Sequence, residues 1–137
     1  MSTMSLLRPS FLPAAVAALL SLGGCATRPS SLDVLNATPA QEYRGHYTRT
    51  QADGSWFRPC GAAAADSAWW VTVTGGAVAQ IDEARRAGQL VEGRPSFVHW
   101  RAVLTRGGEV GPPGATALLV REVVTVRAAA PGDCAAP

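Results

Sequence analysis

Residues 69–105 read WWVTVTGGAVAQIDEARRAGQLVEGRPSFVHWRAVLT, and this stretch carries the signals of a strand, a helix and a second strand in succession. Residues 69–74 form the densest run of β-forming residues in the chain, closed by two glycines. Residues 77–88 show apolar side chains at helical spacing and end in a glycine suited to a helix C-terminus. Residues 96–105 alternate between apolar and polar side chains, which predicts a half-buried strand.

The same periodicities predict which side chains face the interior. On the helix the predicted buried face comprises Val78, Ile81 and either Ala84 or Arg85. On the strand at 96–105 it comprises Val98, Trp100, Ala102 and Leu104, with His99 and Arg101 on the opposite face.

Three further strands flank this stretch. Residues 43–48 alternate around Gly45, which predicts a strand with a bend or a close approach at the glycine. An Asp-Gly turn then leads to a short strand at residues 55–58. Downstream, Gly107–Ala115 is rich in glycine and proline and predicts a loop. The last strand spans residues 116–127.

On that last strand, alternation predicts a buried face of Leu118, Val120, Val124 and Val126, interrupted only by Glu122. Glu122 is expected to pair with Arg101 or Arg121, or to lie where water reaches the barrel mouth.

The predicted fold class is all-β with one short helix. Five strands with a helix between the third and fourth, in about 90 residues, resemble an oligonucleotide/oligosaccharide-binding (OB) fold, a small Greek-key barrel. Other small barrels and sandwiches also contain five strands, so the strand count alone leaves these architectures open.

The N-terminus has the pattern of a secretory signal. Arg8 precedes an apolar run from Phe11 to Leu22, which is too short to span a bilayer of about 30 Å. The run ends in Leu-Gly-Gly-Cys25, which resembles the bacterial lipobox. That resemblance implies cleavage before Cys25 and acylation of its sulfur and its new amino group. Attached acyl chains would anchor the protein through its N-terminal lipid.

The residue after the cysteine is Ala26, not an aspartate retention signal, so by resemblance to sorting in enteric bacteria we expect the outer membrane, facing the periplasm. The expected organisation is a lipoprotein signal peptide at 1–24, a lipidated N-terminus and flexible tether at 25–41, a single barrel domain at 42–134 and a tail at 135–137. Docking of Leu32, Val34 and Leu35 onto the domain is the alternative for the tether.

The charge of the chain does not mark a nucleic-acid partner. The formal net charge is +2, and removal of the segment containing Arg8 leaves about +1. Every basic residue is arginine. We therefore expect no binding to nucleic acid.

Two cysteines remain after lipidation of Cys25. Because the periplasm is oxidising, Cys60 and Cys134 are predicted to form a disulfide that staples the last strand's tail to the second strand. A redox pair would show Cys-x-x-Cys spacing, which these residues lack. A metal site of His46, His99 and Cys60 is a weak alternative, because no two of them share ligand spacing.

Three of the four tryptophans lie close to Cys60 in the sequence. Trp56, Trp100 and one member of the pair Trp69 and Trp70 are predicted to be core residues, because adjacent strand residues face opposite sides. The outward member of the pair is a candidate contact for a sugar or aromatic ligand.

No nucleophile with a positioned base and no phosphate-binding glycine loop is recognisable. The sequence therefore predicts neither enzymatic activity nor a cofactor. Asp82, Glu83, Arg85 and Arg86 on the helix read as a solvated charged face.

The elements Phe57-Arg58-Pro59-Cys60-Gly61 and Pro112-Pro113-Gly114 resemble a loose group of bacterial lipoproteins of uncharacterised function, with a likeness spanning about Gly45 to Val126. These look like OB-type barrels and are distantly similar to NlpE-type copper-resistance and envelope-stress lipoproteins. This chain lacks the Cys-x-x-Cys of NlpE, which puts copper or thiol-redox sensing in doubt.

The predicted function is that of a non-enzymatic, periplasm-facing lipoprotein that binds an envelope protein or a small ligand. Its expected contacts are the outward member of Trp69 and Trp70 together with Pro112 and Pro113. A metal- or envelope-stress sensor using His46 and His99 is one alternative, and an inhibitor of a hydrolase such as lysozyme is another.

Overall fold

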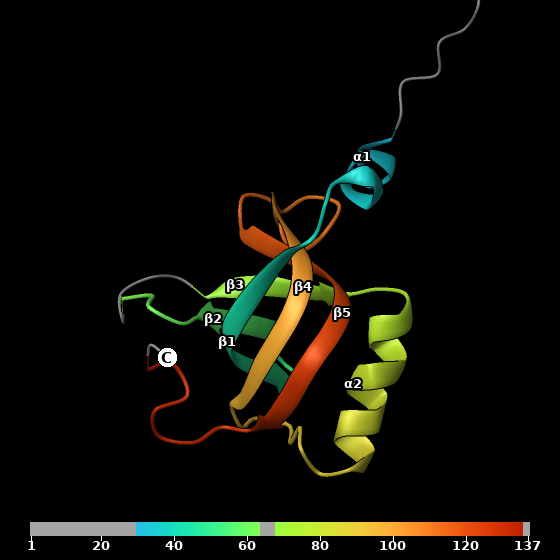
Figure 1. The fold of residues 1–137 in the computed structure, drawn as a ribbon. Helices are drawn as coiled ribbons and strands as arrows, with labels where there is room; N and C mark the ends of the chain where they lie inside the picture. The colour runs from blue at the N-terminus through green and yellow to red at the C-terminus, as the bar shows by residue number, and fades with distance from the viewer. Residues whose placement is uncertain (1–29, 64–67, 136–137) are drawn as a thin grey trace, which may run out of the picture.

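The computed structural model describes residues 30–63 and 68–135 (Figure 1). The elements in chain order are α1 (Ser31–Ala37), β1 (Gln41–Thr50), β2 (Gly54–Pro59), β3 (Trp69–Val73), α2 (Gly76–Arg86), β4 (Ser96–Arg106) and β5 (Thr116–Ala128). The five predicted strands and the helix between the third and fourth are therefore confirmed. Among the described residues, no helix has the length and apolar character needed to cross a bilayer.

The strands close into a barrel in the order β1-β2-β3-β5-β4, with β4 also paired to β1. All neighbours are antiparallel except β3 and β5, which run parallel. This confirms the predicted OB-like Greek-key barrel. Helix α2 makes the connection from β3 to β4 and lies along β5 (Figure 1).

A side-chain amide joins α2 to β5. Gln80 Nε2 donates to the carbonyl of Val123 at 3.0 Å, and the Val123 N–H donates to Gln80 Oε1 at 2.8 Å. The amide thus replaces a missing strand neighbour, because β3 pairs with β5 only from Ala117 to Val120.

Aromatic side chains dominate the barrel interior. Trp100 is completely buried, with its ring centroid 5.3 Å from that of Tyr47 and 5.1 Å from that of Phe57. Its indole Nε1 is buried without a hydrogen-bond partner in the described part of the chain. Buried rings of this size contribute much of the stability of a small barrel.

The close approach predicted at Gly45 is confirmed. A Cβ on Gly45 would lie 2.2 Å from the carbonyl oxygen of Arg58 and 2.8 Å from the Phe57 ring. Only a residue without a side chain allows β1 and β2 to pack around Phe57 at this point.

Helix α2 buries a different face from the predicted one. Ala77, Ile81 and Ala84 are buried, whereas Val78 is 46% exposed. The spacing of the buried residues is four and three, so the helical period is kept and only its phase differs from the prediction.

The interior pattern of β5 also differs from simple alternation. Register shifts lie between His99 and Trp100 and between Arg101 and Ala102 of β4, and each places one extra residue in β5. Val123 is buried as a result, and Val124 is 46% exposed instead of lining the core as predicted.

Two other predicted positions on this sheet turn out to be exposed. Leu104, expected on the buried face of β4, is 45% exposed near the end of the strand. Glu122 points outward, where one carboxylate oxygen lies 3.2 Å from Arg101 Nη1, so the predicted pairing with Arg101 is confirmed.

A second apolar cluster covers the outer side of β4 and β5. It consists of Val103, Val110, Ala117 and Leu119. Leu35 of α1 packs against this cluster, whereas Leu32 and Val34 are exposed. The predicted tether is thus helical over Ser31–Ala37, and Leu35 alone of the three named residues docks.

Polar contacts hold α1 in place. Arg121 donates to the backbone carbonyls of Leu35 and of Thr38, the latter at 2.8 Å, and the hydroxyl of Ser31 bonds to Glu109. Ser30 and Asp33 form a capping box at the start of the helix.

Candidate ligand-binding site

The tryptophan pair at the start of β3 divides between the two faces of the barrel wall. Trp69 packs against the interior cluster, with ring centroids 5.9 Å from both Tyr43 and Phe57. Trp70 packs on the outer side against the second apolar cluster. Of the two predicted ligand contacts, Trp70 is therefore the outward one.

Trp70 is enclosed at both ends of its ring by glycines. A Cβ on Gly54 or on Gly111 would lie 2.4 Å from the indole, and both residues have positive φ angles. Trp70 also meets Trp56 of β2 edge-to-face, with ring centroids 5.2 Å apart. The turn between β1 and β2 and the loop between β4 and β5 thus meet at Trp70.

Trp56 is not a core residue, contrary to the prediction. It is half-buried on the outer face, where its Nε1 donates to the carbonyl of Asp53 at 2.6 Å. Phe57, the next residue, is fully buried instead. The pairing of Phe57 with the buried Tyr47 of β1 decides which of the two rings points inward.

The loop from Gly107 to Ala115 is a closed turn structure. Its ends are joined by a 2.7 Å bond from the Gly107 N–H to the Ala115 carbonyl, and Val110 is buried beneath it. Pro112 and Pro113 are exposed on this loop. The structure therefore brings the predicted prolines and Trp70 into one region through Gly111.

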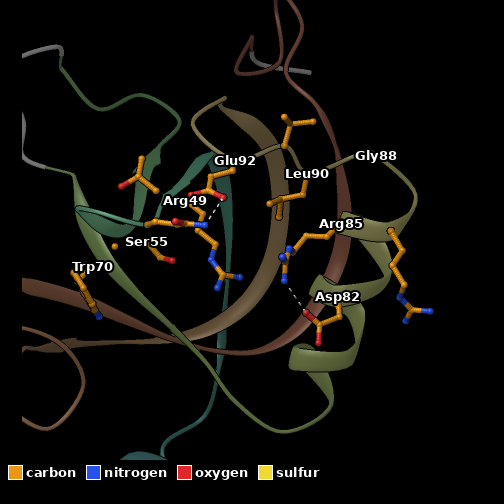
Figure 2. A pocket seen from close by; sticks show the side chains of 13 residues that line it. Arg49, Ser55, Trp70, Asp82, Arg85, Gly88, Leu90 and Glu92 are labelled. Carbon is orange, nitrogen blue, oxygen red and sulfur yellow. Dashed lines mark hydrogen bonds and ion pairs between the residues drawn. The ribbon is translucent and has the colours of Figure 1, made fainter.

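A cleft of about 1040 Å³ opens beside Trp70 (Figure 2). It lies between the β1–β2 hairpin, the second half of α2 and the segment that follows the helix. Its walls are formed by Arg49, Thr50, Gln51, Gly54, Ser55, Trp70, Asp82, Arg85, Arg86, Gly88, Leu90, Val91 and Glu92.

Guanidinium groups enter the cleft from facing walls. Figure 2 shows Arg49 of β1 and Arg85 of α2 pointing into the same space. Arg85 Nη1 lies 3.4 Å from Asp82 Oδ1, and both side chains are half exposed. Within the described residues, Arg49 has no side-chain hydrogen bond or ion pair.

The walls of the cleft are held by contacts with the barrel. The Gly93 N–H donates to the Arg49 carbonyl at 2.8 Å, which fixes the segment after α2 against β1. The buried Tyr47 donates its hydroxyl proton to Ser55 Oγ at 3.1 Å. Gln51 Nε2 lies 3.5 Å from Glu92 Oε2 across the rim. The backbone of Arg49 and the hydroxyl of Ser55 are thus held in place by hydrogen bonds, in the case of Ser55 to a core residue.

The predicted disulfide lies at another part of the barrel. Cys60 and Cys134 are joined, with their Cα atoms 5.1 Å apart. Beside it, the Asp133 side chain is only 3% exposed and accepts from the Ala130 N–H at 2.6 Å. Arg127 Nη2 lies 2.5 Å from the same carboxylate. The Ala130 N–H and the Arg127 guanidinium lower the pKa of Asp133.

The two histidines are not brought together. His46 Nε2 lies 3.7 Å from Asp133 Oδ2, whereas His99 Nε2 lies 3.1 Å from Glu42 Oε2 in a row of charges across β1, β4 and β5. Hydrogen bonds from His99 and Arg101 lower the pKa of Glu42. Over residues 30–63 and 68–135, no three His, Cys, Asp or Glu residues converge on one point.

Sequence reasoning anticipated only part of this site. The sequence points to the outward member of the pair Trp69 and Trp70, without deciding between them, and to the 107–115 loop, but it does not single out Arg49. The predicted solvated charged face of α2 is confirmed, because its four charged side chains are exposed and form two i,i+3 pairs; that Arg85 of this face also borders a cleft is not predicted. No local pattern links a β1 arginine to an α2 arginine, because only the packing of α2 against the barrel brings them together. Cys25, the predicted lipidation site, lies outside the described residues.

Comparison of the chain with models of protein families, with curated proteins and with solved structures finds no match.

Proposed function

We propose that this protein is a non-enzymatic lipoprotein of the bacterial cell envelope, facing the periplasm, and that its barrel binds a ligand at the cleft beside Trp70. The binding role is inferred from one observation: Trp70, the turn after β1 and a cleft that contains arginines lie together on one side of the barrel. Five-stranded barrels of this topology use the β2–β3 face and the loops after β1 and β4 to bind ligands.

A binding role also agrees with the partners of the residues most often used for catalysis. Both histidines lie against carboxylates, at Asp133 and at Glu42, and Cys60 is joined to Cys134. These contacts support the structure around them. Most residues that line the cleft are polar or charged, so the cleft suits a polar ligand that bears charge or hydroxyl groups.

The lipid anchor is proposed from the Leu-Gly-Gly-Cys25 motif that ends the apolar N-terminal run. In its bacterial host, the full-length protein is expected to incorporate labelled palmitate and to fractionate with membranes. The Cys25→Ala variant should lose the label, whereas a Cys60→Ala/Cys134→Ala variant should keep it. An unlabelled wild-type protein, or a mature N-terminus other than residue 25, would contradict the anchor.

The binding role has its own test in living cells. A photo-crosslinking amino acid at position 91 should yield a discrete adduct, because Val91 lines the cleft and is 45% exposed. The same substitution at Val78, which is 46% exposed and does not line the cleft, is the matched control. Equal labelling at both positions, or none at position 91, would reject the cleft as the binding surface.

A further inference from the structure

The cleft contains donors and acceptors in a combination that restricts its ligand. Arg49 and Arg85 contribute positive charges to its walls, and Asp82 and Glu92 contribute negative charges. Arg86 also lines the cleft, but its Nη2 lies 2.9 Å from Glu83 Oε2. The hydroxyl of Ser55, the amide of Gln51 and the indole of Trp70 add neutral polar and aromatic surface. A ligand that fits this lining needs an anionic group and several groups able to bond to carboxylates.

Two of these arginines, Arg49 and Arg85, are available for such an anion. Arg49 has no ion partner within the described part of the chain, and its guanidinium faces that of Arg85 (Figure 2). The contact of Arg85 with Asp82 is a solvent-exposed pair at 3.4 Å, which contributes little stability and leaves guanidinium N–H donors free. Guanidinium groups bind carboxylates and phosphates through paired N–H donors.

The carboxylates argue against a ligand with many negative charges. Asp82 and Glu92 would repel an acidic peptide or a polyanion, because like charges in one cleft oppose binding. The same oxygens accept hydrogen bonds from hydroxyl groups. The indole of Trp70 offers an apolar surface with a polar end at the edge of the cleft.

From these observations we infer that the cleft binds an acidic sugar, with the carboxylate or phosphate of the sugar between Arg49 and Arg85, its hydroxyls toward Asp82 and Glu92, and its ring near Trp70. This inference rests on the proposed binding role of the same cleft and names its ligand class. The cleft volume of about 1040 Å³ accommodates one or two sugar rings.

Calorimetric titration of the full-length protein in non-ionic detergent tests the inference. The probes are N-acetylmuramic acid, which carries a carboxylate, N-acetylglucosamine 6-phosphate, which carries a phosphate, and neutral N-acetylglucosamine. Because charge-assisted hydrogen bonds contribute strongly, at least one acidic sugar is expected to bind about tenfold or more tightly than the neutral one. The tighter of the two acidic sugars identifies the source of the anion.

Single-residue variants test whether the anionic group of the sugar binds between Arg49 and Arg85. Arg49→Gln and Arg85→Gln are each expected to weaken binding of the acidic sugar by about tenfold while leaving the weak binding of the neutral sugar unchanged. Arg106→Gln removes the same charge outside the cleft and should bind as the wild type does. Circular dichroism establishes that each variant is folded, which is expected because both cleft arginines are at the surface.

Three results would overturn the inference. Equal affinity for the neutral and acidic sugars shows that the anionic group is not recognised and rejects the inferred ligand class. Binding of none of the three sugars, with an adduct still formed at position 91 in cells, rejects the ligand class and leaves the proposed function standing. Affinity for acidic sugars that is unchanged in both arginine variants places these sugars outside the cleft and rejects the inference, whereas the proposed binding role is rejected only if the adduct at position 91 is absent as well.

Discussion

Replacing Cys60 and Cys134 together with serine is expected to lower the free energy of unfolding by about 4 kcal/mol. The disulfide joins residues separated by 74 positions, so it closes most of the barrel into one loop. For a loop of this length, the chain-entropy relation gives about 4.4 kcal/mol of stabilisation, through restriction of the unfolded chain. A domain of this size is stable by about 5–15 kcal/mol, so the variant should fold but with little margin.

We expect the native contacts of the C-terminal segment to be kept when Cys60 and Cys134 are replaced by serine. Asp133 keeps its bonds to Arg127 and to the Ala130 N–H, which hold the segment after β5. The loss should therefore come from the unfolded state, with the barrel and its tryptophan core unchanged.

Urea unfolding followed by tryptophan fluorescence measures the effect, because Trp100 is buried in the interior. The wild type and the double variant are compared with Cys25→Ala, which also lacks a cysteine but keeps the bridge. The melting temperature of the double variant should fall by about 15–30 °C, at 4–8 °C per kcal/mol. A loss below about 1 kcal/mol would refute the assignment of the bridge as the main constraint on the unfolded chain.

Two further perturbations test the packing and the charges. Gly45→Ala should lower the free energy of unfolding by about 3 kcal/mol or more, because its Cβ would overlap the Arg58 carbonyl and the Phe57 ring. The control Gly76→Ala lies in open space on α2 and should be neutral or stabilise by about 0.5 kcal/mol. Chemical unfolding of both variants measures this, and equal effects would contradict the close approach at Gly45. Since the pKa of Asp133 is lowered in the folded state, its stabilisation is present above its ordinary value of 3.8 and disappears as the pH falls through the lower folded value. The stability difference between the wild type and Asp133→Asn should accordingly be full at neutral pH and shrink below pH 3.8, and a difference independent of pH would show that the carboxylate charge is not involved.

The strands could be located from the sequence because each carries a local signal. The alternation in residues 96–105 and the β-forming run at 69–74 predict strands irrespective of what lies beside them. The special role of Gly45 was likewise predictable, because a glycine within a strand often marks a bend or a close approach of a ligand or of another backbone. The single bridge between Cys60 and Cys134 followed from counting cysteines under the assumption of export.

Side-chain orientation was predictable only where the strand was regular. In β5, two register shifts against β4 move the buried position from Val124 to Val123. No residue type or pattern in the strand predicts these shifts. In β2, Trp56 and Phe57 are both large and apolar, so alternation cannot decide between them. The pairing of Phe57 with Tyr47 and of Trp56 with Trp70 settles the orientation.

The sequence by itself determined the order of the five strands and of helix α2, marked Gly45 as a place of a bend or a close approach, and indicated the pairing of two sulfurs, because these depend on residues close together in the chain or on simple counting. The tertiary structure decided that Trp70 faces outward and that Arg49 and Arg85 share a cleft. These arrangements depend on the registers between β1, β2 and β3 and on how α2 lies against the closed barrel. Such long-range geometry is the joint result of packing many side chains at once, and no short segment of the chain encodes it.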